Sequence, residues 1–152
     1  MISRIISVRP LDHAMTTKAH DIKISELDGF DQVSALIAGR PLFHFSRVHS
    51  FRYFGRREDE LGDQWSDIEL VMEEFDPPHA QVGIRFHRVA DVSFSGFGQI
   101  MGLYFQSIQE RGWEKLRFEV GDYEDGRIHL FCHEISVFDH ATWPNHALSL
   151  CR

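Results

Sequence analysis

The chain has 152 residues, a hydrophobic fraction of 43% and a formal net charge of −7. This length predicts one domain, and a chain with thirteen Phe can bury enough apolar surface to fold. No apolar stretch reaches the ~18–20 residues that a membrane span needs, and the opening segment 1–8 is too short for a signal-peptide core. We therefore expect a folded cytoplasmic protein that does not bind a membrane.

The two cysteines do not predict disulfide, metal or redox chemistry. Cys132 lies in an apolar run and Cys151 is the penultimate residue, and the sequence has no Cys-x-x-Cys pair. Both thiols are expected to be free, as is usual in a reducing compartment.

The acidic excess is concentrated in two segments. Residues 41–78 carry nine acidic and four basic side chains, and residues 113–152 carry seven and four, whereas the rest is nearly balanced. Such a surface repels the phosphate backbone, so the composition argues against nucleic-acid binding. Two interpretations stay open: the charge serves solubility alone, or it forms a face that meets a basic partner.

One helix is predicted, over Asp31–Ala38. Val33, Leu36 and Ile37 fall on one helical face, and Asp31 is available as the N-cap. Gly39 and Pro41 follow where a helix would end.

Strands are predicted after residue 42, because aromatic and β-branched residues then recur with a period of two. The segments Asp67–Phe75 and Gln81–Arg88 each place apolar residues on one face, and Glu69 and Glu73 are expected on the solvent face of the first. The charged segment Arg56–Asp63 between apolar regions reads as a loop.

The most secure pairing is a hairpin with its turn at Glu124-Asp-Gly126, which joins Glu114–Tyr123 to Arg127–Phe138. The segment Ile100–Ile108 fits a helix or a strand, and we favour the strand. The sequence thus predicts an α+β fold, predominantly antiparallel β-sheet, folded or sandwich-like, with one or two short helices.

Ten histidines suggest metal binding, but their spacing does not support it. His129 and His133 would lie ~13 Å apart along one strand, and His133 and Glu134 would point to opposite faces of it. His44 and His49 would also face opposite ways. The glycines of Ser95–Gln99 lack the Lys and Ser/Thr of a phosphate loop and predict a tight connection. We therefore expect no cofactor, no metal and no catalytic residues.

Trp65 stands inside the densest acidic stretch, and aromatic anchors surrounded by charge are typical of protein interfaces. A solvated loop and strand face is the alternative. On the binding interpretation the contact residues are Glu58, Asp59, Glu60, Asp63, Trp65 and Asp67.

The layout of residues 30–138 resembles small bacterial immunity proteins of polymorphic toxin systems, and within them the family called immunity protein 50. The resemblance rests on the short helix before Gly-x-Pro, the segment Phe43–Phe51, the acidic loop, the strand Ile68–Phe75 and the segment Val82–Phe97. Family members tend to have Phe-His-Asp after the proline, where this chain reads Phe43-His44-Phe45.

This resemblance implies a non-enzymatic protein that binds and neutralises a cognate protein toxin. The other function considered is a small ligand-binding or regulatory β-domain. Homodimerisation through an exposed sheet edge is compatible with both.

Overall fold

The computed structural model describes residues 20–38, 42–58, 60–95, 99–100, 102–112, 115–123 and 126–140. Its helices are α2 (Phe30–Ile37) and the short 3₁₀ turns η1 (Ile24–Glu26), η2 (Leu42–His44) and η3 (Gln109–Arg111). Its strands are β1 (His20–Asp21), β2 (Arg47–Glu58), β3 (Gln64–Glu73), β4 (Gln81–His87), β5 (Ala90–Phe94), β6 (Leu103–Ser107), β7 (Phe118–Asp122), β8 (Ile128–Cys132) and β9 (Glu134–Asp139).

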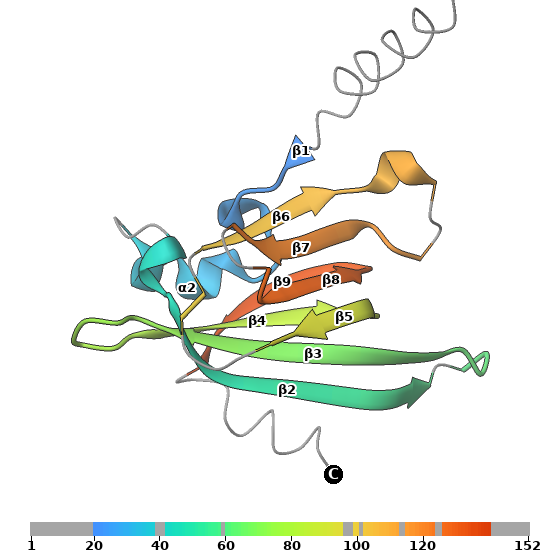
Figure 1. Cartoon of the computed structure of the whole chain (residues 1–152), viewed down its shortest axis with the longest axis horizontal. Coiled ribbons are helices and arrows are strands. Elements are labelled where there is room, and N and C mark those ends of the chain that lie inside the picture. Colours follow the sequence, from blue (N-terminus) through green and yellow to red (C-terminus); the bar gives the residue numbers. More distant parts are fainter. Residues whose placement is uncertain are drawn as a thin grey trace, which may run out of the picture.

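The strands form two antiparallel sheets (Figure 1). One sheet has five strands in the order β1-β6-β7-β8-β5, and the other has four in the order β2-β3-β4-β9. The predicted α+β class with predominantly antiparallel sheet is therefore confirmed. The strand assigned to 100–108 is confirmed as β6, and the paired arms of the predicted hairpin are β7 and β8.

Two strands pass side by side from one sheet to the other and make a corner. β4 continues into β5 through Arg88 and Val89, and β8 continues into β9 through His133. β4 pairs with β9 on one side of the corner, and β5 pairs with β8 on the other. The amide of His133 donates to the carbonyl of His87 over 2.8 Å and so joins the two bends. Bends of this kind let strands change sheets.

The sequence prediction of one strand over 127–138 is therefore wrong in its second half. Cys132 ends β8 and Glu134 begins β9, so the two halves belong to different sheets. Periodicity did not reveal the break, because apolar residues continue through both halves.

The hydrophobic core lies between the sheets and is closed by α2. Val33 and Ile37 of the helix are buried and join the same cluster as Ile68, Leu130 and Val137. Removing this apolar surface from water is the main stabilising contribution of the fold. The apolar faces expected for β3 and β4 are confirmed by buried Ile68, Leu70 and Met72, and by buried Val82, Ile84 and Phe86. The expected solvent-exposed opposite faces are wrong, because Glu69 of β3 and Arg85 of β4 are buried as well.

The helix begins one residue earlier than predicted, and its N-cap is Gly29 rather than Asp31. Gly29 has φ 84°, a left-handed conformation that glycine adopts without steric cost. It lies beside β9, where the Val137 amide donates to the carbonyl of Asp28 over 2.8 Å. Gly39 and Pro41, expected to end the helix, are outside the described residues.

The β2–β3 hairpin extends past the rest of its sheet, as Figure 1 shows. β4 pairs with β3 only from Ile68 to Glu73, whereas Gln64 and Trp65 pair with β2 alone. The predicted loop at 56–63 is thus shorter than expected, because β2 runs to Glu58. Register shifts after Val48 and Phe54 also interrupt the expected alternation of β2. Tyr53, between them, is 60% exposed.

No helix among the described residues is long and apolar enough to cross a membrane. Cys132 is free and buried, and burial raises the pKa of its thiol far above the usual range. It is therefore a core residue and a poor nucleophile. Cys151 is outside the part of the chain that the structure describes.

Candidate functional site

Of the predicted contact residues that the structure describes, all except Asp67 cluster at the outer end of the β2–β3 hairpin. Glu58, Glu60 and Asp63 are exposed around the turn, and Trp65 is half-buried near the start of β3. Leu61 lies between them and is 89% exposed. Asp59 is outside the described residues. The hairpin end therefore combines acidic groups with exposed apolar surface.

Asp63 is exposed, but its carboxylate already has an ion-pair partner within the protein and is less available to bind another molecule. Its carboxylate is 3.1 Å from the ammonium of Lys115, which precedes β7. The contact links the hairpin to the other sheet, although an exposed pair of this kind contributes only ~0–1 kcal/mol.

Asp67 is the exception, and its assignment to an exposed acidic face is wrong. Asp67 is only 4% exposed to solvent. One carboxylate oxygen accepts the backbone N–H of Arg88 over 3.1 Å, and the other is 3.5 Å from Nδ1 of His87. Glu69, also expected in solvent, is 2% exposed, because both faces of β3 are buried along its middle. Asp67 is thus part of the corner between the sheets.

The environment of Asp67 favours its charged form. Burial alone would raise the pKa of the carboxyl group, but contact with His87, the Arg88 amide and nearby positive charge outweigh it. The pKa therefore lies below its usual range. An ionised Asp67 holds the bend at Arg88, whose φ of 54° is unfavourable for a residue with a Cβ.

A cleft opens at this corner, and we call it the corner cleft. It encloses about 290 Å³ and is lined by Trp65, His87, Arg88, His133 and Glu134. The Arg88 guanidinium lies over the Trp65 indole, 4.7 Å from the ring centroid, which is cation–π geometry. Of these residues the sequence predicted only Trp65 as a contact residue, and it placed His133 and Glu134 on opposite faces of one strand, because the lining residues meet only when both strands bend.

A second hollow of about 410 Å³ lies at the hairpin and is lined by Tyr53, Gly55, Gln64, Trp65 and Ser66. The Tyr53 hydroxyl and the Ser66 hydroxyl are 2.7 Å apart, which holds the phenol against β3. Trp65 thus borders hollows on both sides. Half-buried aromatic residues beside such hollows are the usual anchors of protein recognition.

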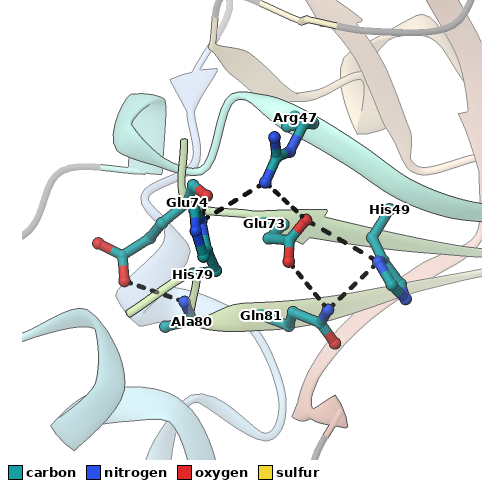
Figure 2. Close-up of polar contacts among 7 residues, drawn as sticks. All are labelled: Arg47, His49, Glu73, Glu74, His79, Ala80 and Gln81. Atoms are coloured by element: carbon teal, nitrogen blue, oxygen red, sulfur yellow. Dashed lines mark hydrogen bonds and ion pairs between the residues drawn. The ribbon is translucent and has the colours of Figure 1, made fainter. Parts of the chain in front are cut away.

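A polar network occupies the opposite end of the four-stranded sheet (Figure 2). Glu73 is at its centre, 3.2 Å from Arg47 and 3.3 Å from the Gln81 amide nitrogen. The same nitrogen is 3.2 Å from Nδ1 of His49, and Nδ1 of His79 is 3.5 Å from Arg47. Since these contacts join β2, β3 and the start of β4, we assign the network a structural role.

The histidines are dispersed over the molecule. His44 is in η2 rather than a strand, and His49 lies at a register shift of β2. His129 of β8 is 2.7 Å from Glu119 of β7, on the other sheet. His133 sits between strands, so the prediction that it points away from Glu134 is wrong: its Nε2 is 3.9 Å from the Glu134 carboxylate.

No group of three or more His, Cys, Asp or Glu residues among the described positions could hold a metal ion. The glycine-rich connection is described only at its ends, Ser95 and Gln99, since residues 96–98 are outside the described part.

The stability of the protein at low pH tests whether Asp67 and Glu73 are ionised in the folded state. Burial would raise the pKa of Glu73, but the Gln81 hydrogen bond and the charges of Arg47 and His49 lower it. A depressed pKa stabilises the fold above the unfolded value of about 4, and this stability is lost as pH falls through the folded value. We expect the free energy of unfolding to decrease below about pH 4.

In the Asp67→Asn, Glu73→Gln double variant this decrease should be shallower, because neither side chain can take up a proton. Chemical denaturation at several pH values measures it, and Glu110→Gln, at an exposed position, is the control. A double variant as acid-sensitive as the parent would contradict the assignment.

Comparison of the chain with protein-family models, with curated proteins and with solved structures finds no match.

Proposed function

We propose that this chain is a non-enzymatic immunity protein of the bacterial cytoplasm that binds and neutralises a cognate protein toxin. The sequence resemblance to immunity proteins suggests the class, and the β2–β3 hairpin supports a binding role. Pairing of two copies through a sheet edge stays a prediction.

The observation that carries the proposal is the composition of the projecting hairpin end. Leu61 is 89% exposed and Tyr53 60% exposed, and Trp65 lies half-buried between two hollows. Glu58 and Glu60 are exposed beside them. An apolar centre with an acidic rim complements a basic partner, because the charges accelerate association and the aromatic side chain supplies affinity.

The function itself is tested by neutralisation. The gene beside the one for this chain should encode a large protein with a variable C-terminal toxin domain, and co-expression should restore growth of cells that produce that domain. A toxin domain that still arrests growth, with no complex isolated by affinity purification, would contradict the proposal.

The acidic rim is tested by charge reversal. Glu58→Lys with Glu60→Lys should slow association with the toxin domain by about tenfold at low salt, because steering is lost. The difference should shrink as salt rises, since surface charges are screened. Surface plasmon resonance measures both rates. Glu26→Lys with Glu110→Lys, also exposed, is the matched control; equal association rates for both double variants would contradict the acidic rim.

A further inference from the structure

The corner cleft has chemistry that toxin binding does not use. Its two imidazoles, His87 and His133, come from the two strands that bend side by side. Their side chains are 34% and 31% exposed, so each is half-buried but accessible from the cleft.

Each imidazole is held in one orientation through Nδ1. Nδ1 of His133 is 3.0 Å from the carbonyl oxygen of Lys115, which can only accept, so this nitrogen carries a proton. Nδ1 of His87 faces the carboxylate of Asp67, which is ionised and also only accepts. Nε2 is therefore the atom with which each ring can meet a ligand, as donor when the ring is protonated, and at His133 the ligand competes with the Glu134 carboxylate, 3.9 Å away.

The walls of the cleft suit a group that is charged at one end and flat and apolar at the other. Arg88 adds a permanent positive charge, and the indole of Trp65 supplies the apolar wall. The carboxylate of Asp67 fixes the Arg88 backbone from behind. At 290 Å³ the cleft is at the lower limit for drug-sized ligands, which need about 300–1,000 Å³.

We propose that the corner cleft binds the phosphate group of a small aromatic phosphate monoester. The phosphate oxygens accept from protonated His87 and His133 beside Arg88, and the aromatic group packs on the part of the Trp65 indole that the Arg88 guanidinium leaves uncovered. Arginine and charged hydrogen bonds are the usual means of holding phosphate in proteins. The imidazoles and Arg88 take no part in the proposed toxin contact, whereas Trp65 lines the cleft and is also the proposed toxin anchor, so the two sites share this side chain.

The charges around the cleft nearly balance when the imidazoles are left out. Arg88 and Lys115 are positive; Asp67, Glu134 and Asp63 are negative, and Asp63 is paired with Lys115. A bound phosphate monoester carries up to two negative charges, so its binding favours the protonated form of both imidazoles.

The test is an NMR titration of the full chain with inorganic phosphate and with phenyl phosphate, followed at the imidazole C–H signals. Both probes should shift the signals of His87 and His133 and raise their titration midpoints, while His129 on the other sheet stays unchanged. Phenyl phosphate should bind about tenfold more tightly, since its ring packs on Trp65. Equal affinity would overturn the monoester assignment, and an absence of shifts at millimolar phosphate would overturn the site.

Variants on the rim of the cleft sharpen the test. Glu134 is 55% exposed at its side chain, so Glu134→Gln should fold normally and tighten phosphate binding about threefold by removing the nearest negative charge. His133→Asn should weaken it about tenfold, and His129→Asn should not change it. Weaker binding by Glu134→Gln would contradict an anion site. Glu58→Lys with Glu60→Lys serves as the hairpin control and should leave phosphate binding unchanged.

Discussion

Replacing Gly29 by alanine is expected to lower the free energy of unfolding by about 3 kcal/mol. Two physical causes add at this position. The residue has φ 84°, which costs any other L-residue roughly 1–2 kcal/mol. In addition, a Cβ would overlap the carbonyl oxygen of Val137, a backbone atom of β9 that cannot move away cheaply. Urea denaturation followed by circular dichroism measures the loss.

Gly112 separates the two causes. It also has a left-handed conformation, with φ 71°, but a Cβ there would meet no atom within 4 Å. Gly112→Ala should therefore cost only about 1 kcal/mol, which is the conformational penalty alone. If both variants lose the same free energy of unfolding, the close approach of Gly29 to β9 contributes nothing to the loss in Gly29→Ala.

Trp65→Ala is expected to weaken toxin binding by at least about 2 kcal/mol, roughly 30-fold in the dissociation constant. The indole lines both the hollow at the hairpin and the corner cleft, so its removal leaves the centre of the proposed interface without its anchor. Isothermal titration with the isolated toxin domain measures the change. Tyr123→Ala is the matched control, because this aromatic residue is 68% exposed but directly follows β7 of the other sheet.

Trp65 also supports Arg88, so its loss could act through the fold. Leu61→Asp avoids this ambiguity, because an 89% exposed side chain contributes little to stability. It should leave thermal unfolding unchanged and still weaken binding. Full affinity in both Trp65→Ala and Leu61→Asp would place the toxin contact elsewhere on the molecule.

Much of the fold could be predicted from the sequence because local patterns determine it. The alternation of Ile68, Leu70 and Met72 identified the inner face of β3, and Val82, Ile84 and Phe86 did the same for β4. The Asp-Gly signal located the pairing of β7 with β8. The polar face of β3 was misjudged, since Asp67 and Glu69 are buried by their surroundings in the fold.

The candidate site was only half predictable. Trp65 and the acidic residues beside it are close in sequence, so their clustering was visible. His87, Arg88 and His133 come from two bends that are distant along the chain, and apolar residues run through the second bend without interruption. The positive φ of Arg88 has no sequence signal, because it depends on the hydrogen bond to Asp67.

The corner between the sheets bears on how the protein unfolds. β4 with β5 and β8 with β9 are continuous pieces of chain, and their bends are joined by the hydrogen bond from His133 to His87. One sheet cannot detach from the other without breaking pairs in both, and the two sheets share one core. The amides of β4 and β8 should therefore exchange with solvent only through the same global opening, as members of one cooperative unit.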